Sequence, residues 1–142
     1  LSNVPYSRSK EVVKWLSFHQ FREAILLVQK EFSEKLIACP GDANYSVISV
    51  VSQYCFDIEQ LFDVKKDSFL PPPQIESKVV RLRRNAKKMN NDIIYNLEHL
   101  FSRRNKKIMS RIADNRVINK KIDELDAESL VRLCNKLIDL KQ

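Results

Sequence analysis

The stretch AILLVQKEFSEKLIACPGDAN, residues 24–44, predicts the order strand, helix and loop from which the rest of the fold follows. Its first six residues form a short apolar run. The length and flanks of that run favour a buried strand, although periodicity alone does not exclude a helix. The next segment, KEFSEKLIA, places Phe32, Leu36 and Ile37 on one side of a helix. CPGDAN, with its proline, glycine and aspartate, ends that helix in a loop.

Helices and strands are expected on both sides of this stretch. Upstream, Ser9 is expected to cap a helix that runs to about Phe18. Downstream, residues 45–53 fit a strand by their β-branched composition and also fit one helix face, and we favour the helix. Strands are expected at 54–64 and 78–84, and the three prolines between them require an ordered, non-helical loop. A parallel or mixed sheet with helices on its faces is the natural α/β assembly.

The C-terminal part of the sequence has a different composition. Beyond Arg84 it is polar and basic, and NAKKMNN is the expected linker. A helix opened by Asn91 or Asp92 follows, and the apolar spacing in NKKIMSRIA and DAESLVRLCNKLIDL predicts two more. We therefore expect two parts. Residues 1–84 belong to one domain and end with its last strand, and residues 85–142 form a small all-helical domain.

Length, charge and cysteine content restrict the class of protein. The 142 residues suffice for one ordinary domain, or for one small domain and part of another. No apolar run approaches the roughly 20 residues of a membrane span, so we expect a soluble protein. The formal net charge of +7 is compatible with a polyanionic partner. The three cysteines lack metal-type spacing and are odd in number, which argues against a disulfide framework and a zinc site and favours a cytoplasmic location.

Two absences are informative as well. Gly41 is the only glycine, so a glycine-rich phosphate loop and the glycine turn of a nucleotide-binding strand-to-helix junction are both excluded. The sequence starts with Leu1 rather than Met and shows no secretory signal pattern. We expect it to start in mid-protein.

The quartet Asn3, Val4, Pro5 and Tyr6 offers groups that could bind a base. Modifying an exocyclic amine requires that the base is held flat and that the amine hydrogens are accepted, so that the nitrogen lone pair points at the reagent. Tyr6 could stack on the ring, and the Asn3 amide oxygen could accept one hydrogen. The carbonyl next to Pro5, which no helix consumes, could accept the other. The quartet by itself is also typical of a turn after a strand, with Tyr6 packed on the core.

A resemblance to a known family runs through the chain. The segments NVPY, LLVQKEFSEKLIACPGDANYS, SVVSQYCFDIEQLFDV and SFLPPPQIESKVVRL occur in this order and at these distances. Together they resemble the second half of the ribosomal RNA adenine dimethyltransferases, the KsgA family, to which the Erm methyltransferases are related. The resemblance covers residues 1–84, and LEHLFSRRNKKI resembles the start of the family's helical C-terminal domain.

The resemblance implies a fold, a cofactor and a reaction. The fold is a class I, Rossmann-like methyltransferase, of which this chain would form the second half of the sheet. S-adenosylmethionine would be the methyl donor, and the reaction would dimethylate the exocyclic amine of two adjacent adenosines in small-subunit ribosomal RNA. Such a transfer needs no metal and no nucleophilic side chain, because the methylsulfonium is already activated.

The resemblance also implies residue roles. Asn3 and the Pro5 carbonyl would orient the amine, and Tyr6 would stack on the base. Val4 would belong to the same substrate-binding surface, and Asn3 would also border the donor. Phe69, before the triple proline, falls on the aromatic that the family places on the other side of the base. It could instead be a buried anchor of the proline loop.

This sequence departs from the family pattern in three places. The family's glycine-rich donor loop and the acidic residue that grips the donor ribose lie upstream of the motif, where no sequence is given. The chain would therefore lack most of the donor site and be inactive alone. The residues SRS after the quartet, with Arg8, replace the commoner NIS or KIS, and Ser46 stands where the family usually has glycine. Both changes leave the fold intact and put target specificity in question.

Two basic clusters are predicted to contact RNA phosphates, although charge runs are often only solvated faces. Such contacts would hold structured RNA by its shape and backbone rather than by its sequence. The clusters are Lys78, Arg81, Arg83, Arg84, Lys87 and Lys88 around the linker, and Arg103, Arg104, Lys106, Lys107 and Arg111 in the tail.

Two alternative functions stay open. One is a non-catalytic RNA-binding or ribosome-assembly module on a methyltransferase-like scaffold. The other is modification of DNA or of large-subunit RNA. The triple proline and the segments VQKEF and PGDANY favour small-subunit RNA instead. Without an upstream half, one edge and one face of the sheet would be uncovered, and self-association between copies would hide them.

Overall fold

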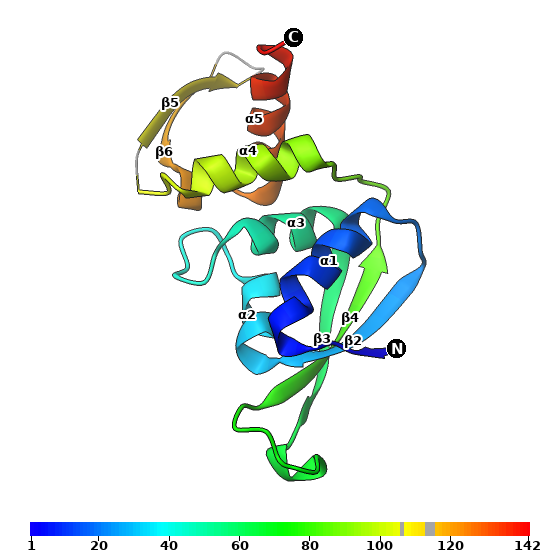
Figure 1. Ribbon diagram of the computed structural model, residues 1–142. Coiled ribbons are helices and arrows are strands. Elements are labelled where there is room, and N and C mark those ends of the chain that lie inside the picture. Colours follow the sequence, from blue (N-terminus) through cyan, green and yellow to red (C-terminus); the bar gives the residue numbers. More distant parts are fainter. Residues whose placement is uncertain (106, 113–115) are drawn as a thin grey trace.

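The computed structural model describes residues 1–105, 107–112 and 116–142, with side chains for 1–105 and 120–142. In chain order the helices and strands are β1 (Ser2–Asn3), α1 (Ser9–Phe18), β2 (Glu23–Gln29), α2 (Lys30–Ile37), α3 (Val47–Cys55), β3 (Phe56–Val64), β4 (Ser77–Arg84), α4 (Asn91–Phe101), β5 (Lys107–Ile112), β6 (Arg116–Lys121) and α5 (Ala127–Asp139) (Figure 1). Short 3-10 helices lie at Tyr6–Arg8, Lys66–Ser68 and Ile122–Glu124. None of the described helices combines the length and the apolar composition that a bilayer crossing requires.

Strands β1 to β4 form one mixed sheet in the order β1-β2-β4-β3. β1 runs parallel to β2, and β4 is antiparallel to both of its neighbours. The three longer strands lie where the sequence predicts them, and residues 45–53 lie mainly in helix α3, so the helical alternative was correct. Because β4 is paired along both edges, its first residue, Ser77, stands between Gln29 on one side and Val64 on the other.

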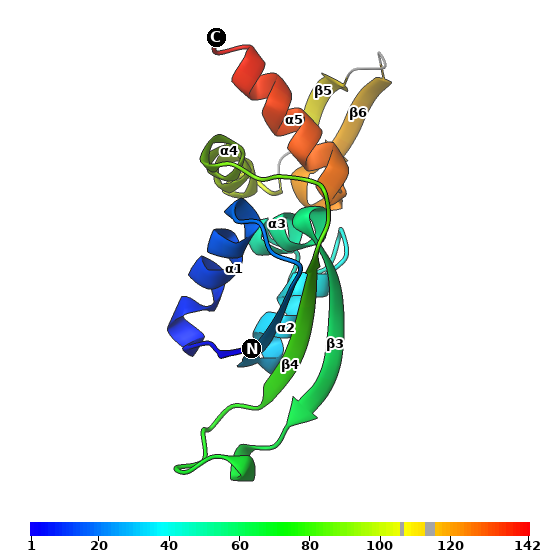
Figure 2. The same cartoon turned by 90° about the vertical axis from the view of Figure 1, so that its right-hand side faces the viewer.

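Helices α1, α2 and α3 cover one face of this sheet (Figure 2). Alternate strand residues point into that layer. Among them Val28, Val80 and Leu82 are fully buried, as are Leu36 of α2 and Val51 of α3. The hydrophobic core of the first 84 residues therefore lies between the sheet and these helices.

The end of α2 is completed by side chains of α3. The last carbonyls of a helix have no partner within the helix. The carbonyl of Leu36 accepts hydrogen bonds from the Ser52 hydroxyl and from the Gln53 side-chain amide, both at 3.1 Å. The Gln53 amide also donates to the Ala38 carbonyl at 2.7 Å. Polar residues on the inner side of α3 thus replace the partners that α2 lacks.

Helix α1 begins without the side-chain cap that the sequence predicts. The cap position is Arg8, whose side chain makes no capping hydrogen bond, and Ser9 is already the first helical residue. The Ser9 hydroxyl is buried and has no hydrogen-bond partner among the described residues. The prediction of Ser9 as the cap is wrong because the 3-10 turn Tyr6–Arg8 runs directly into the helix, which leaves no extended residue in the cap position.

The tail is not all helical. Its helices α4 and α5 pack on α3 and begin with side-chain caps. The Asn90 amide oxygen accepts from the Ile93 N–H at 2.9 Å, and the Asp126 carboxylate accepts from the Ser129 N–H at 2.7 Å. Between them β5 and β6 pair as an antiparallel hairpin, so the helix predicted there is wrong over residues 107–112. β-Branched residues favour strands, and periodicity cannot separate a short apolar strand from a short helix.

One buried apolar cluster crosses the expected boundary between residues 84 and 85. It contains Leu97 of α4, Leu130 of α5 and Val51 of α3, and all three side chains are fully buried. The division into residues 1–84 and 85–142 stays a prediction. The burial indicates that the tail and the sheet part share a core.

Candidate functional site

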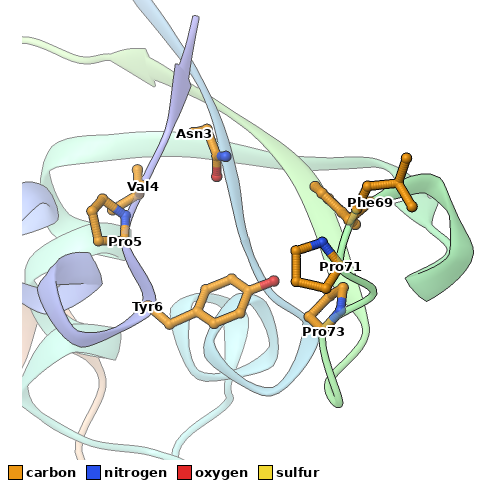
Figure 3. A pocket seen from close by; sticks show the side chains of 8 residues that line it. Asn3, Val4, Pro5, Tyr6, Phe69, Pro71 and Pro73 are labelled. Carbon is orange, nitrogen blue, oxygen red and sulfur yellow. The ribbon is translucent and has the colours of Figure 1, made fainter.

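The opening quartet and the proline loop meet at one pocket, although they are far apart in the sequence. The pocket has a volume of about 310 Å³. The quartet forms one wall and the loop between β3 and β4 forms the other (Figure 3). The lining residues are Asn3, Val4, Pro5, Tyr6, Phe69, Leu70, Pro71 and Pro73. The structure therefore brings together all five residues for which the sequence predicts catalysis or base binding.

Val4 fixes the quartet to the sheet. β1 pairs in parallel with β2, with Asn3 opposite Leu27, and the Val4 N–H donates to the Leu27 carbonyl at 3.3 Å. The Val4 side chain belongs to the buried core and is 1% exposed, whereas Asn3 and Pro5 on either side of it are exposed. Because alternate residues of an extended chain point in opposite directions, burying Val4 leaves the Asn3 side chain at the pocket.

Two carbonyls adjoin Pro5, that of Val4 and that of Pro5 itself, and only the Val4 carbonyl is free. The Pro5 carbonyl accepts a hydrogen bond from the Arg8 N–H at 2.8 Å, in the 3-10 turn that follows. The expectation that no helix consumes this carbonyl is therefore wrong for Pro5. The Val4 carbonyl accepts no hydrogen bond from the described residues. It and the Asn3 amide oxygen are the unused acceptors of the quartet.

Tyr6 lies across the bottom of the pocket in the view of Figure 3. Its side chain is half-buried, and its hydroxyl lies 2.6 Å from the Ser77 hydroxyl. The ring lines the pocket, so Tyr6 is not simply packed into the core.

Phe69 lies opposite the quartet with Pro71 and Pro73 (Figure 3). It is half-buried, so both its predicted role beside a base and its role as an anchor of the loop are compatible with its position. The end of the loop is tied to α2, because the Glu76 carbonyl accepts from the Lys30 N–H at 2.9 Å. The Glu76 carboxylate also pairs with the Lys30 ammonium at 3.2 Å, and this hydrogen bond raises the pKa of Lys30.

The composition of the pocket suits a flat ring better than a charged donor. Aromatic and proline side chains dominate its walls, and Asn3 supplies an amide. No carboxylate or ammonium group is among the lining residues, so nothing there matches the ribose and the amino-acid end of S-adenosylmethionine. Apart from the Tyr6 hydroxyl, the Asn3 amide is the only polar side-chain group among the lining residues. The lining of this pocket is therefore suited to a flat ring such as a base.

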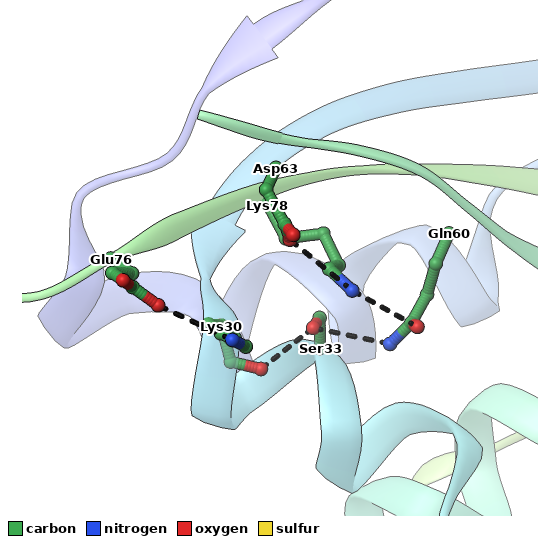
Figure 4. A network of polar contacts seen from close by, with 6 residues as sticks. All are labelled: Lys30, Ser33, Gln60, Asp63, Glu76 and Lys78. Atoms are coloured by element: carbon green, nitrogen blue, oxygen red, sulfur yellow. Dashed lines mark hydrogen bonds and ion pairs between the residues drawn. The ribbon is translucent and has the colours of Figure 1, made fainter. Parts of the chain in front are cut away.

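Most cations of the first basic cluster are already paired with carboxylates. Lys78 contacts Gln60 and Asp63 on β3, and Figure 4 shows this network continuing to Ser33 of α2. Strands and helices distant in sequence provide the other partners. The ion pairs are Lys78–Asp63 at 3.3 Å, Arg81–Glu59 at 2.9 Å, Arg83–Glu23 at 3.2 Å, Lys87–Glu128 at 2.5 Å and, in the second cluster, Arg104–Asp123 at 3.3 Å. Their RNA-binding role stays a prediction, now with competing partners.

The other predicted cations differ in their surroundings. The Arg84 side chain is half-buried, and its guanidinium carbon lies 5.5 Å from the centre of the Phe56 ring. Lys88 and Arg103 are exposed and form no ion pair with a described residue. Lys106 lies outside the described residues, and for Lys107 and Arg111 only the backbone is described.

Sequence reasoning missed three exposed cations that lie a few positions from pocket residues in the sequence. Lys65 and Lys66 begin the loop that carries Phe69, and both are exposed and form no ion pair within the described part of the chain. Lys10 is likewise exposed near the start of α1. These lysines lie close to the proline loop and the quartet in the sequence, which would have indicated them. They were not predicted because they do not belong to a longer run of charge.

The sequence matches the ribosomal RNA adenine dimethylase family over residues 1–138. Ribosomal RNA small subunit methyltransferase A of Thermotoga petrophila is 40% identical over 86 residues, which are 61% of this chain and 33% of that protein. The probable ribosomal RNA small subunit methyltransferase A of Methanosarcina acetivorans is 29% identical over 164 aligned residues, covering 99% of this chain and 61% of that protein. The chain thus spans less than two thirds of the length of these relatives.

Solved structures show the same fold. A dimethyladenosine transferase from Plasmodium falciparum superposes with a TM-score of 0.80 at 22% identity, over 96% of this chain and 65% of that one. The 23S rRNA methyltransferase ErmE gives a TM-score of 0.57 at 20% identity, over 96% and 63%. This likeness confirms an α/β methyltransferase-like fold with a mixed sheet. Because the family match extends over almost the whole sequence, the chain belongs to the ribosomal RNA adenine dimethylase family.

Proposed function

We propose that this chain is the acceptor-binding, C-terminal part of an S-adenosylmethionine-dependent enzyme. The enzyme would dimethylate the exocyclic amines of two adjacent adenosines in small-subunit ribosomal RNA. The observation that carries the proposal is the convergence of Asn3, Tyr6 and Phe69 on one pocket, in a chain of the ribosomal RNA adenine dimethylase family. The names of the relatives, which are small-subunit methyltransferases, support this substrate over large-subunit RNA or DNA.

In this proposal the pocket residues place an amine rather than activate one. The adenine ring lies between Tyr6 and Phe69, and its amine hydrogens point at the Asn3 amide oxygen and the Val4 carbonyl. With both hydrogens accepted, the nitrogen lone pair faces the donor, and the same acceptors favour the charge that develops on nitrogen. The donor, when bound, supplies a methyl group that its sulfonium has already activated.

The donor itself is assigned mainly to residues outside this pocket. The pocket has no carboxylate for the donor ribose and no counter-ion for its amino-acid group, and Asn3 alone would border it. The chain alone is therefore proposed to be inactive, and the enzyme to work in the cytoplasm, where ribosomes assemble and thiols stay reduced. Self-association of the chain through its uncovered sheet edge is a further expectation, which light scattering would check.

RNA phosphates are proposed to lie along the unpaired cations around the pocket. Lys65 and Lys66 precede Phe69 in its loop, Lys10 follows the quartet, and Lys88 and Arg103 extend the positive surface into the tail. Unpaired cations bind phosphate without first breaking an ion pair, and phosphate contacts position the nucleic acid.

A nucleoside mass analysis tests the proposal. The chain is fused behind the donor-binding segment of the Thermotoga petrophila relative and incubated with S-adenosylmethionine and unmodified small ribosomal subunits. Dimethyladenosine is expected, with a loss of about 10²–10³-fold in rate for Asn3→Ala, because a preorganised hydrogen-bonding group at the reacting centre is removed. Asn44→Ala, on an exposed loop, is the matched control. A folded fusion that binds the donor and RNA but methylates nothing would favour the non-catalytic RNA-binding module.

A further inference from the structure

We infer that Ser77 is a positioning residue of the proposed site, because it holds the ring of Tyr6 through a single hydrogen bond. The inference rests on the proposed function. The two hydroxyl oxygens are 2.6 Å apart, although the residues are 71 positions apart in the sequence. The bond therefore joins the catalytic quartet to the far side of the pocket, where the proline loop returns to the sheet.

Ser77 is a rigid anchor. It is the first residue of the central strand β4, where it is paired with Gln29 of β2 and with Val64 of β3. It is 1% exposed, so water does not compete for its hydroxyl. A hydroxyl fixed in this way offers Tyr6 one position for its own oxygen.

The residues on both sides of Ser77 are held as well (Figure 4). Glu76 is bound to Lys30 through its carbonyl at 2.9 Å and through its carboxylate at 3.2 Å. Lys78 contacts Gln60 and Asp63 of β3, each at 3.3 Å. The position of Ser77 therefore depends on β2, β3 and α2 and not on the exposed tip of the proline loop.

Tyr6 needs such an anchor more than the rest of the quartet does. Val4 is held by the core, but Tyr6 is only half-buried, in a short 3-10 turn. A side chain with room around it samples several rotamers, and a hydrogen bond from its end selects one. Since Phe69 lies on the loop that ends just before Ser77, this bond sets the Tyr6 ring relative to Phe69. It thereby determines the width of the slot that a base would enter.

The test uses two variants that remove the same bond from opposite ends. Ser77→Ala deletes the anchor, and Tyr6→Phe keeps the ring and deletes its hydroxyl. The double variant and the loop control Ser68→Ala complete the set. Two quantities are measured on the 142-residue chain. The first is the order parameter of the aromatic ring at position 6 by carbon-13 relaxation. The second is the affinity for a fragment from the 3′ end of small-subunit RNA, with fluorescent 2-aminopurine replacing one adenosine, whose stacking quenches the signal.

Each single variant is expected to lower the order parameter of the ring at position 6 and to weaken binding about five- to tenfold, with weaker quenching at saturation. The double variant should bind the RNA as tightly as either single variant and show the same ring order, because all three variants lack the same Tyr6–Ser77 hydrogen bond. Ser77→Thr, which keeps the hydroxyl, should recover the wild-type values, and Ser68→Ala should match them throughout. If Ser77→Ala does not fold, Tyr6→Phe alone decides the outcome.

Unchanged ring order and affinity in the single variants would overturn the inference, and so would losses that multiply in the double variant. Ring disorder without any loss of affinity would also overturn the positioning role. A wild-type chain that does not bind the RNA would contradict the proposed function instead, and the ring order would still report separately whether Ser77 holds Tyr6.

Discussion

At the scale of single residues, Val4 and Asn3 divide structural and chemical roles between neighbours. Val4 is buried in the core and Asn3 is exposed at the pocket. The orientation of Asn3 follows from the packing of Val4, because successive residues of an extended chain point to opposite sides. A substitution at Val4 would therefore alter the site without touching a substrate.

Phe69→Ala should weaken binding of the 2-aminopurine RNA by about tenfold, because the stacking of one base on an aromatic ring contributes ~1–3 kcal/mol. Ile75→Ala is the matched control, since Ile75 is an exposed apolar residue, 46% exposed, in the same loop but outside the pocket lining. Equal losses in the two variants would indicate that the loop as a whole, rather than the ring of Phe69, supports binding.

The three thiols should react at very different rates with a disulfide reagent at pH 8. Cys39 is exposed, whereas Cys55 and Cys134 are buried. Burial raises the pKa of both, that of Cys134 to about 12. One thiol should therefore react at once and two only on unfolding, as mass spectrometry with and without denaturant would show. Three equal rates would contradict the burial.

The raised pKa values of these two thiols also make the stability of the fold depend on pH. A buried thiol stays protonated in the folded chain, while in the unfolded chain it titrates near its ordinary value of 9.0. Its contribution to the free energy of unfolding is therefore complete below pH 9 and is lost as the pH rises towards 12. The loss with rising pH should be smaller in Cys134→Ser, measured by urea unfolding at each pH.

At the scale of elements, the sequence predicts single helices and strands better than it predicts which segments pair with one another. Helix α3 was ambiguous because its β-branched residues favour a strand, and the contacts of Ser52 and Gln53 with the end of α2 help to decide for a helix. The β5–β6 hairpin was missed because each strand is only six residues long and depends on the other for its hydrogen bonds. Both outcomes depended on partners outside the segment.

Helix α5 provides a direct test of a cap. Asp126→Ala removes the acceptor of the Ser129 N–H and should lower the free energy of unfolding by about 1 kcal/mol. Asp139→Ala, at the other end of the same helix, removes a similar carboxylate where no cap is needed. Urea unfolding followed by circular dichroism measures both. A loss of equal size in the two variants would show that charge, and not the cap, is responsible.

At the scale of the whole molecule, the shared core predicts cooperative unfolding across the boundary at residue 84. Leu97 of α4 is fully buried, and Leu97→Ala should lower the free energy of unfolding by about 2–5 kcal/mol. The loss should appear in the fluorescence of Trp15, the only tryptophan, on helix α1 of the sheet part. Leu140→Ala, 81% exposed in the tail, is the control. An unchanged Trp15 transition in Leu97→Ala would mean that tail and sheet unfold independently.

Charge pairing across the molecule predicts which cations meet RNA. Replacing Lys65 and Lys66 by alanine should reduce the slope of log affinity against log salt by up to about 1.4, since each neutralised phosphate of a single strand contributes ~0.7. Lys35→Ala, a cation paired with Glu31 on α2, should leave the slope unchanged. Salt titrations of RNA binding measure both, and a slope that falls in Lys35→Ala but not in the double variant would contradict the assignment of the contacts to the unpaired cations.

Local sequence by itself determined the three longer strands of the sheet, the helices α1, α2, α4 and α5, and the residue types of the acceptor site, because periodicity and prolines act over a few positions. Tertiary structure decided what those residues do together. It brought Phe69 to the quartet and set carboxylates from other strands beside Lys78 and Arg81. These outcomes depend on strand order and register, which no local pattern encodes.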